Sequence, residues 1–143
     1  MFQWKKEFEL GITSIDTQHQ ILFEIGNKIY DLLIIRSKES DDYDEIKEII
    51  SELEKYVICH FKTEENLLEK YNYPDIEAHK KEHAVFATYL EQINEEDIQN
   101  HQTEFLKDLF DNFTQWIFNH IITTDYLYKD YLLRLVKKQE DEL

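Results

Sequence analysis

Glycine and proline are scarce in this 143-residue chain, which contains two glycines and one proline. All-β proteins need many tight turns built from these residues, so the scarcity argues against an all-β fold. The single cysteine, Cys59, cannot form an internal disulfide, which agrees with a reducing compartment. The sequence has no run of about 18 uncharged apolar residues and no apolar stretch after the basic residues near its start. We therefore expect a soluble cytoplasmic protein without a transmembrane helix or secretory signal.

Basic residues are also few, 16 against 31 acidic residues, and the net charge is −15. Such a surface repels phosphate backbones and anionic lipids, so nucleic acids and membranes are not expected partners. Negative charge equally serves to keep a small domain soluble and monomeric, and we expect a monomer. The length suits one hydrophobic core, which predicts a single domain over residues 1–143.

Apolar residues recur at three- and four-residue steps in four long segments, which indicates amphipathic helices. The segments cover about 17–37, 43–71, 74–94 and 101–120, and the last continues as an amphipathic tail to about 135. Thr13 or Ser14 is expected to cap the first helix, and Pro74 suits the first position of the third. Charged residues 38–44 and the polar stretch 94–100 separate the segments. The sequence therefore predicts an all-α, up-and-down antiparallel four-helix bundle.

Histidines are the most informative residues. Five of the six lie in the apolar seams, and every predicted helix contributes at least one: His19, His60, His79, His83 and His120. Any one of them alone could be a hydrogen-bonded core residue. Because the seams face a common axis, the five imidazoles should converge, and burying them without a shared partner would be costly. A metal ion would make the same nitrogens its ligands.

Two carboxylates accompany these histidines. His60 and Glu64 are four residues apart, as are His79 and His83, so each pair shares a helix face. Asp125 follows His120 by five residues, which is roughly 140° around a regular α-helix. The intervening residues 121–124 are β-branched and form helix poorly, so a distortion there would turn Asp125 inward. Without such a distortion, Asp125 would lie on the surface.

This donor set exceeds what one tetrahedral zinc ion uses and suits two six-coordinate ions that share both carboxylates. Nitrogen-rich ligation without thiolate favours iron over magnesium or calcium. Cys59 faces about 100° away from His60 on a helix, and we interpret it as a small buried hydrophobic residue.

The order His19, His60-x-x-x-Glu64, His79-x-x-x-His83 and His120-x-x-x-x-Asp125 resembles the ligand signature of the hemerythrins, in particular the single-domain bacterial hemerythrins. The surrounding residues are similar too: Gly11-Ile12, Ile15-Asp16-Thr17-Gln18 before His19, Phe61 and Glu65, Tyr73-Pro74, and Trp116. The resemblance extends over essentially the whole chain.

The resemblance implies a non-haem centre of two iron ions (Fe2+/Fe3+) with an oxo or hydroxo bridge, which binds O2 reversibly and also accepts small anions such as azide. His79, His83 and His120 would hold one iron, and His19 and His60 the other, which keeps an open position. Glu64 and Asp125 would bridge the two ions. The function expected is that of an O2 carrier, store or local scavenger, with no catalytic residues.

Further positions are assigned beyond the ligand set. Ile117, one turn before His120, and Phe23, one turn after His19, are candidates for the apolar O2 pocket, although both could be ordinary core residues. Gln18 could accept a hydrogen bond from a metal-bound imidazole. His101, which lies among polar residues, is expected at the surface.

Other functions remain open. His79-Lys80-Lys81-Glu82-His83 matches the H-x-x-E-H motif of zinc metalloproteases, with Glu82 as the general base, but this leaves the other predicted ligands unexplained. A ferritin-like oxidase would use two Glu-x-x-His motifs, and no histidine here follows a glutamate at that spacing. An oxidase or ferroxidase activity, or a role in O2 or redox sensing, stays an alternative to O2 storage or transport.

Overall fold

The computed structural model describes residues 3–36 and 41–141, with side chains as far as residue 135. The described part is helical and contains no strand. The helices are α1 (Thr13–Ile35), α2 (Tyr43–Lys70), α3 (Ile76–Glu91), α4 (Glu95–Asn100), α5 (Gln102–Asn119) and α6 (Tyr126–Asp141). Two short elements complete the chain, the 3-10 turn η1 (Lys6–Phe8) and the π-helix η2 (His120–Asp125).

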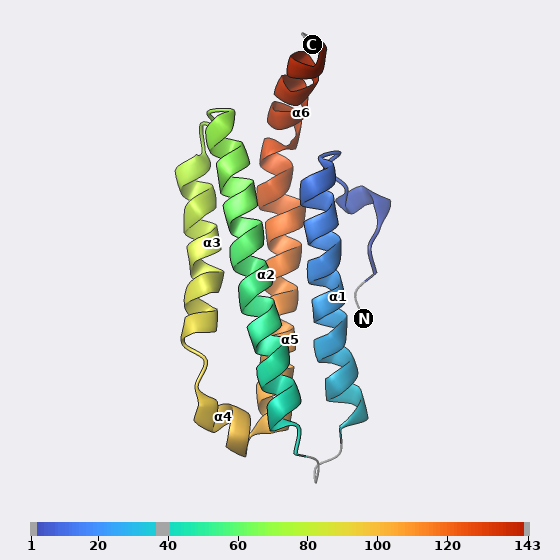
Figure 1. Cartoon of the computed structure of the whole chain (residues 1–143), viewed down its shortest axis with the longest axis vertical. Coiled ribbons are helices and arrows are strands. Elements are labelled where there is room, and N and C mark those ends of the chain that lie inside the picture. The colour runs from blue at the N-terminus through green and yellow to red at the C-terminus, as the bar shows by residue number, and fades with distance from the viewer. Residues whose placement is uncertain (1–2, 37–40, 142–143) are drawn as a thin grey trace.

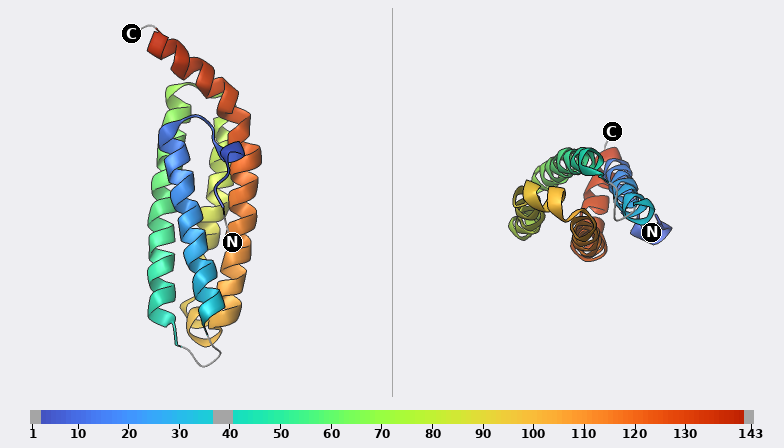
Figure 2. Two further views of the ribbon diagram at one scale, coloured as in Figure 1. Left: turned by 90° about the vertical axis from the view of Figure 1, so that its right-hand side faces the viewer. Right: turned by 90° about the horizontal axis from the view of Figure 1, so that it is seen from below.

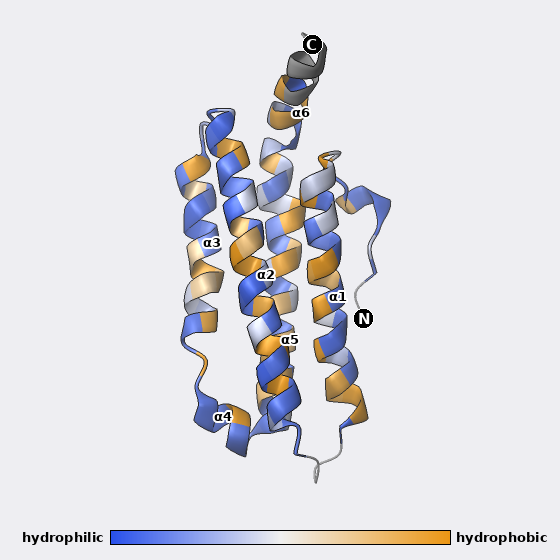
Figure 3. Cartoon of the chain, in the orientation of Figure 1, coloured by the Kyte–Doolittle hydropathy of each residue, from blue (hydrophilic) through white to orange (hydrophobic). Residues whose placement is uncertain are grey.

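Four long helices, α1, α2, α3 and α5, run antiparallel around a common axis (Figures 1 and 2). Each has a hydrophobic stripe and a hydrophilic face, as expected for helices that share one core (Figure 3). Buried leucine, isoleucine and phenylalanine side chains from all four fill the interior. The predicted all-α four-helix bundle is therefore confirmed. Among the described residues, no helix is long and apolar enough to cross a membrane.

The turn between α2 and α3 sets the register of these two helices. Asn72 has a φ of 54°, in the left-handed region that asparagine tolerates. Its N–H donates to the Glu69 carbonyl at 3.1 Å, and the Tyr73 N–H donates to the Leu68 carbonyl at 2.9 Å. This is a Schellman motif, which ends α2 and reverses the chain. Pro74 lies in the turn, two residues before α3 begins, so its predicted place at the first helical position is wrong.

The start of α1 also differs from the prediction. Its N-cap residue is Ile12, and neither Thr13 nor Ser14 caps the helix, because both are already helical. Asp16 instead accepts hydrogen bonds from two backbone N–H groups of the preceding segment, at 2.8 and 3.0 Å. One of these donors is Gly11, whose φ of 86° favours glycine. The Asp16 carboxylate thus ties the N-terminal segment to α1.

Four further boundaries and positions need correction or comment. The third helix ends at Glu91 rather than near 94, and residues 95–100, expected to be a polar break, form α4. The Asn94 side chain accepts a hydrogen bond from the Glu96 N–H at 2.8 Å and caps this short helix. Cys59 is exposed on α2, not buried. Of the predicted connection 38–44, residues 38–40 lie outside the described part of the chain, and α2 already begins at Tyr43.

Candidate metal centre

The buried polar side chains of the bundle form one group. Among the residues whose side chains the structure describes, the polar or charged ones that are buried are His19, His60, Glu64, His79, His83, His120 and Asp125. At most 2% of any of them is exposed. These are the seven positions that the sequence singled out as ligands. The structure brings all seven together, while their binding of a metal stays a prediction.

The antiparallel arrangement explains how four helices reach one point. His19 lies in the second turn of α1, and His79 lies in the first turn of α3, so both are near the same end of the bundle. His60 and Glu64 lie in the second half of α2, which runs toward that end. His120 follows directly after α5. The candidate centre therefore occupies the half of the bundle nearest to α6 (Figure 1).

The π-helix η2 accounts for Asp125. The expected distortion after His120 is present, because residues 120–125 adopt the i→i+5 arrangement of a π-helix. This wider turn brings a residue five positions along back to the same side as the first. Both ends of η2, His120 and Asp125, consequently face the interior and are completely buried. The alternative of a surface aspartate is excluded by this burial.

The ring nitrogens of the five histidines converge through the same atom, Nε2. His19 and His60 approach each other at 3.2 Å between their Nε2 atoms. His83 and His120 do so at 3.1 Å, on the other side of the cluster. Two groups can each hold an ion: Glu64 with His79, His83 and His120, and Glu64 and Asp125 with His19 and His60. Within each group the ligand atoms all lie within 4.8 Å of one another.

Glu64 spans the two groups of histidines. Its Oε1 atom contacts His79 Nε2 and lies 2.9 Å from His83 Nε2 and 3.1 Å from His120 Nε2. The other oxygen, Oε2, lies 3.3 Å from His60 Nε2 and 3.8 Å from His19 Nε2. Each oxygen of one carboxylate thus faces a different set of imidazoles.

Asp125 divides its oxygens in the same way. Oδ1 lies 3.1 Å from His120 Nε2 and 3.4 Å from His79 Nε2, whereas Oδ2 lies 3.0 Å from His19 Nε2. Neither oxygen has a hydrogen-bond partner among the described residues, although both are buried. A buried carboxylate without such partners is costly unless a cation neutralises it.

A side-chain network fixes the tautomer of His60. The Thr63 hydroxyl donates to the Cys59 carbonyl at 3.0 Å, so its oxygen accepts from Gln18 Nε2 at 3.1 Å. This orients the Gln18 amide with Oε1 toward His60 Nδ1, 2.8 Å away. Because an amide oxygen only accepts, Nδ1 carries the proton and Nε2 presents a lone pair. The suggestion that Gln18 partners a candidate ligand is supported by this contact.

Glu65 fixes the tautomer of His83 in the same way. Its carboxylate accepts from His83 Nδ1 at 2.9 Å, which leaves Nε2 of His83 unprotonated when the ring is neutral. Inward lone pairs on neighbouring imidazoles repel each other unless a positive centre lies between or beside them. Metal-bound histidines typically donate their outer N–H to a carboxylate, amide or carbonyl, as these two do. The donor set therefore fits a pair of metal ions.

The pKa values of the histidines follow from burial and from the carboxylates. Burial lowers the pKa of His19 well below its usual value, and nearby His60 lowers it further. Burial also lowers the pKa of His60 and of His79, although Glu64 opposes this. For His120, burial is outweighed by Asp125 and Glu64, which raise its pKa to about 10. Most of the imidazoles are thus neutral and can offer a lone pair to a metal ion. The two carboxylates favour a positive charge at the centre of the cluster.

Tyr128 is a contact of the centre that the sequence analysis missed. Its side chain is fully buried, and its hydroxyl donates to Glu64 Oε2 at 2.9 Å. Burial raises the pKa of this phenol well above its usual value, so it remains a donor at neutral pH. The available signal was its place in the apolar seam of the tail, three residues after Asp125.

Aromatic rings pack against two of the histidines. Phe61 stacks on His83, with 3.9 Å between ring centroids and 8° between planes. Trp116 stacks on His120 at 4.5 Å and 14°. These rings exclude water from one side of the cluster. Ile117 and Phe23, the pocket candidates, are both buried in the surrounding hydrophobic core.

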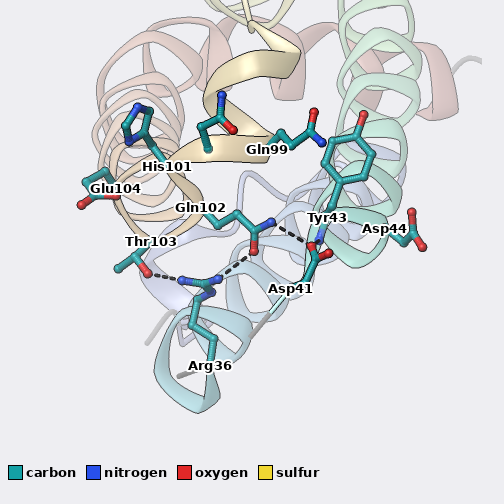
Figure 4. A pocket seen from close by; sticks show the side chains of 10 residues that line it. Arg36, Asp41, Tyr43, Asp44, Gln99, His101, Gln102, Thr103 and Glu104 are labelled. Atoms are coloured by element: carbon teal, nitrogen blue, oxygen red, sulfur yellow. Dashed lines mark hydrogen bonds between the residues drawn. The ribbon is translucent and has the colours of Figure 1, made fainter. Parts of the chain in front are cut away.

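Other candidate features lie outside this cluster. His101 is exposed, as expected, and takes no part in either ligand group. A hollow of about 860 Å³ lies at the far end of the bundle, between the end of α1 and the starts of α2 and α5 (Figure 4). There the Arg36 guanidinium donates to Gln102 Oε1 at 2.7 Å and to the Thr103 hydroxyl. This hollow contains none of the seven buried polar residues.

Comparisons with known proteins agree with the geometry. The family model "Hemerythrin HHE cation binding domain" matches residues 10–132. A bacteriohemerythrin from Clostridium acetobutylicum is 42% identical over 130 residues, which cover 91% of this chain and 100% of that protein. A hemerythrin-like protein from Naegleria gruberi is 33% identical and covers 92% of this chain and 93% of its own length. A crystal structure of wild-type hemerythrin superposes with a TM-score of 0.74 at 26% identity, covering 92% of this chain and 98% of that one.

Proposed function

The chain belongs to the hemerythrin family, and from this premise we propose that it binds O2 reversibly at a centre of two iron ions in the bundle core. The observation that carries the proposal is the division of both carboxylates between two sets of imidazoles. A carboxylate that turns one oxygen to each of two donor sets is suited to bridging two ions. A nitrogen-rich donor set without thiolate suits iron.

The ligands divide between the ions as the distances suggest. His79, His83 and His120 would hold one iron, and His19 and His60 would hold the other, with Glu64 shared. Asp125 would be shared as well, because its two oxygens face His120 and His19. One ion then has one protein ligand fewer, which leaves it room for an external ligand such as O2 or a small anion. When bound, the iron pair supplies the two electrons that O2 uptake requires and recovers them when O2 leaves.

The surrounding residues orient the proposed ligand side chains and exclude water from them. Gln18 and Glu65 accept the outer N–H groups of His60 and His83, which holds the inner nitrogens unprotonated. Tyr128 donates to Glu64 and fixes the rotamer of that carboxylate. Ile117 and Phe23 belong to the apolar wall that keeps water and protons from the centre, and this exclusion favours release of O2 over irreversible oxidation.

The proposed role is that of an O2 carrier, store or local scavenger rather than an enzyme. The zinc metalloprotease alternative requires Glu82 as a base directed at the metal. The Glu82 carboxylate is instead directed at His120 Nδ1, 3.4 Å away, and at the Thr124 hydroxyl, both on η2. The ferritin-like oxidase alternative would predict irreversible oxidation on contact with O2.

The test is a visible spectrum of the iron-loaded, reduced protein before O2, after O2 and after evacuation. We expect a nearly colourless protein that gains a visible absorption band with O2 and loses it under vacuum, through several cycles. Immediate oxidation that evacuation does not reverse would contradict reversible binding and favour an oxidase. The variant Cys59→Ser, which changes an exposed residue, serves as a control and should behave like the wild type.

A further inference from the structure

The Glu82 carboxylate, on the neighbouring helix α3, contacts the first and the fifth of the six residues of the π-helix η2. Its Oε1 atom lies 3.4 Å from His120 Nδ1, at the first residue of η2. Its Oε2 atom accepts a hydrogen bond from the hydroxyl of Thr124, the fifth residue. His120 Nδ1 is buried and makes no hydrogen bond among the described residues, and the carboxylate oxygen that faces it, at ion-pair distance, is Glu82 Oε1.

A π-helix of this kind needs external support. It is rarer than the α-helix, and the β-branched residues Ile121, Ile122, Thr123 and Thr124 add little local helix propensity. If η2 relaxed to a regular α-helix, Asp125 would turn roughly 140° from His120 and leave the cluster. Asp125 lies 3.0 Å from His19 Nε2 and 3.1 Å from His120 Nε2, but neither of its oxygens makes a hydrogen bond among the described residues.

Trp116 fixes Glu82 relative to the end of α5. The indole stacks on the His120 ring, with 4.5 Å between centroids and 14° between planes. Its Nε1–H donates to the backbone carbonyl of Glu82 at 3.4 Å. Trp116 therefore contacts both the His120 ring and the backbone of Glu82, and it holds the two residues beside each other.

We propose that Glu82 is a positioning residue, which holds η2 in its π conformation through Thr124 and orients His120 through Nδ1. Through this contact Glu82 keeps Asp125 directed at both sets of histidines. The inference rests on the proposed function for its consequence on metal binding, but its structural part concerns the conformation of η2 alone. In this inference Glu82, the glutamate of the H-x-x-E-H motif, supports the structure of η2 and does not act as a general base.

Glu65 provides a matched comparison. It is also a glutamate beside a candidate ligand, it accepts from His83 Nδ1 at 2.9 Å, and its side chain is 27% exposed against 33% for Glu82. Among the described residues, no hydrogen bond or ion pair joins Glu65 to η2. Substitution of Glu65 should therefore affect its own histidine without changing the conformation of η2.

The experiment compares Glu82→Ala, Glu82→Gln, Thr124→Val and Glu65→Ala by amide hydrogen exchange resolved to residues 120–126. We expect Glu82→Ala to exchange there at least about tenfold faster than the wild type, the factor that corresponds to ~1.4 kcal/mol. Thr124→Val, which removes one hydroxyl donor at nearly constant volume, should show a smaller increase. Glu82→Gln keeps the acceptor oxygen and should largely restore protection, and Glu65→Ala should match the wild type.

A second measurement follows metal binding, with Co2+ as the probe and a chelator as competitor. We expect Glu82→Ala to lose roughly 10- to 100-fold in affinity, as is usual for partners of metal-bound histidines. In the Co2+ protein, Glu82→Ala and Glu65→Ala should each lose a different shifted histidine N–H signal to solvent exchange. That signature separates positioning of an imidazole from a general loss of stability.

The two measurements separate the possible failures. If the wild type binds neither iron nor Co2+, the proposed function is wrong, while hydrogen exchange still tests the hold of Glu82 on η2. If exchange in residues 120–126 is equal in Glu82→Ala and Glu65→Ala, the positioning role is overturned. If Glu82→Ala does not fold, Thr124→Val decides, and wild-type exchange in that variant would overturn the role of the Thr124 contact.

Discussion

Replacing Tyr128 with phenylalanine removes a single oxygen atom from the wall of the candidate centre. The Tyr128 ring is fully buried and packs near His79, with 5.4 Å between centroids, and these contacts remain in the variant. What is lost is the 2.9 Å hydrogen bond from the hydroxyl to Glu64 Oε2. Tyr128→Phe therefore tests the support of Glu64 with little change in packing.

The expected loss of stability in Tyr128→Phe follows from the charge of Glu64, which accepts the hydrogen bond. A hydrogen bond to a charged group contributes about 1.5–3 kcal/mol. For a chain of this length, 1 kcal/mol corresponds to roughly 2–4 °C, and we expect the melting temperature to fall by about 3–12 °C. Iron affinity should fall roughly 10- to 100-fold, because Glu64 is proposed to bridge both ions.

The assay is thermal unfolding together with iron retention during dialysis against a chelator. Tyr131→Phe is the matched control, since the Tyr131 hydroxyl donates to the backbone carbonyls of Tyr71 and Asn72, at 2.6 and 3.0 Å, away from the cluster. We expect this control to lose some stability and no iron. Equal iron retention in the wild type, Tyr128→Phe and Tyr131→Phe would refute the reasoning about Tyr128.

Three further predictions concern the same centre. Glu64→Ala should lose more iron than His19→Ala, because Glu64 contacts both sets of imidazoles and His19 belongs to one; equal iron content in the two variants would contradict this. Ile117→Ala should speed autoxidation and azide binding at unchanged iron content, at about 2–5 kcal/mol in stability; wild-type rates beside a lowered melting temperature would make Ile117 an ordinary core residue. Removal of iron by a chelator should lower the melting temperature, because the buried imidazoles and carboxylates then face one another without a cation; calorimetry with and without iron measures this.

The long helices and the buried cluster could be predicted because they depend on spacing within one helix. Positions four residues apart share a face whatever the partners are, which places His60 beside Glu64 and His79 beside His83. The weak helix formers between His120 and Asp125 even indicated the distortion that became η2. The predicted ligand role of these residues awaits measurement.

What the sequence could not indicate depends on contacts between helices. Cys59 was interpreted as buried, but the residue is exposed on α2. Glu82 was assigned as the general base of the metalloprotease alternative, and Tyr128 was given no role at the centre. Their actual partners, His120 with Thr124 and Glu64, lie on other elements. The single domain over residues 1–143 stays a prediction, of which the family match covers 10–132.

The central claim is that the cluster holds two iron ions, and elemental analysis of the purified protein tests it most directly. Metal content per chain would be measured together with assays for haem and acid-labile sulfide. Because Glu64 and Asp125 each face both sets of histidines, the expected result is two irons per chain with neither haem nor labile sulfide. A single zinc ion per chain, or iron accompanied by labile sulfide, would contradict the account.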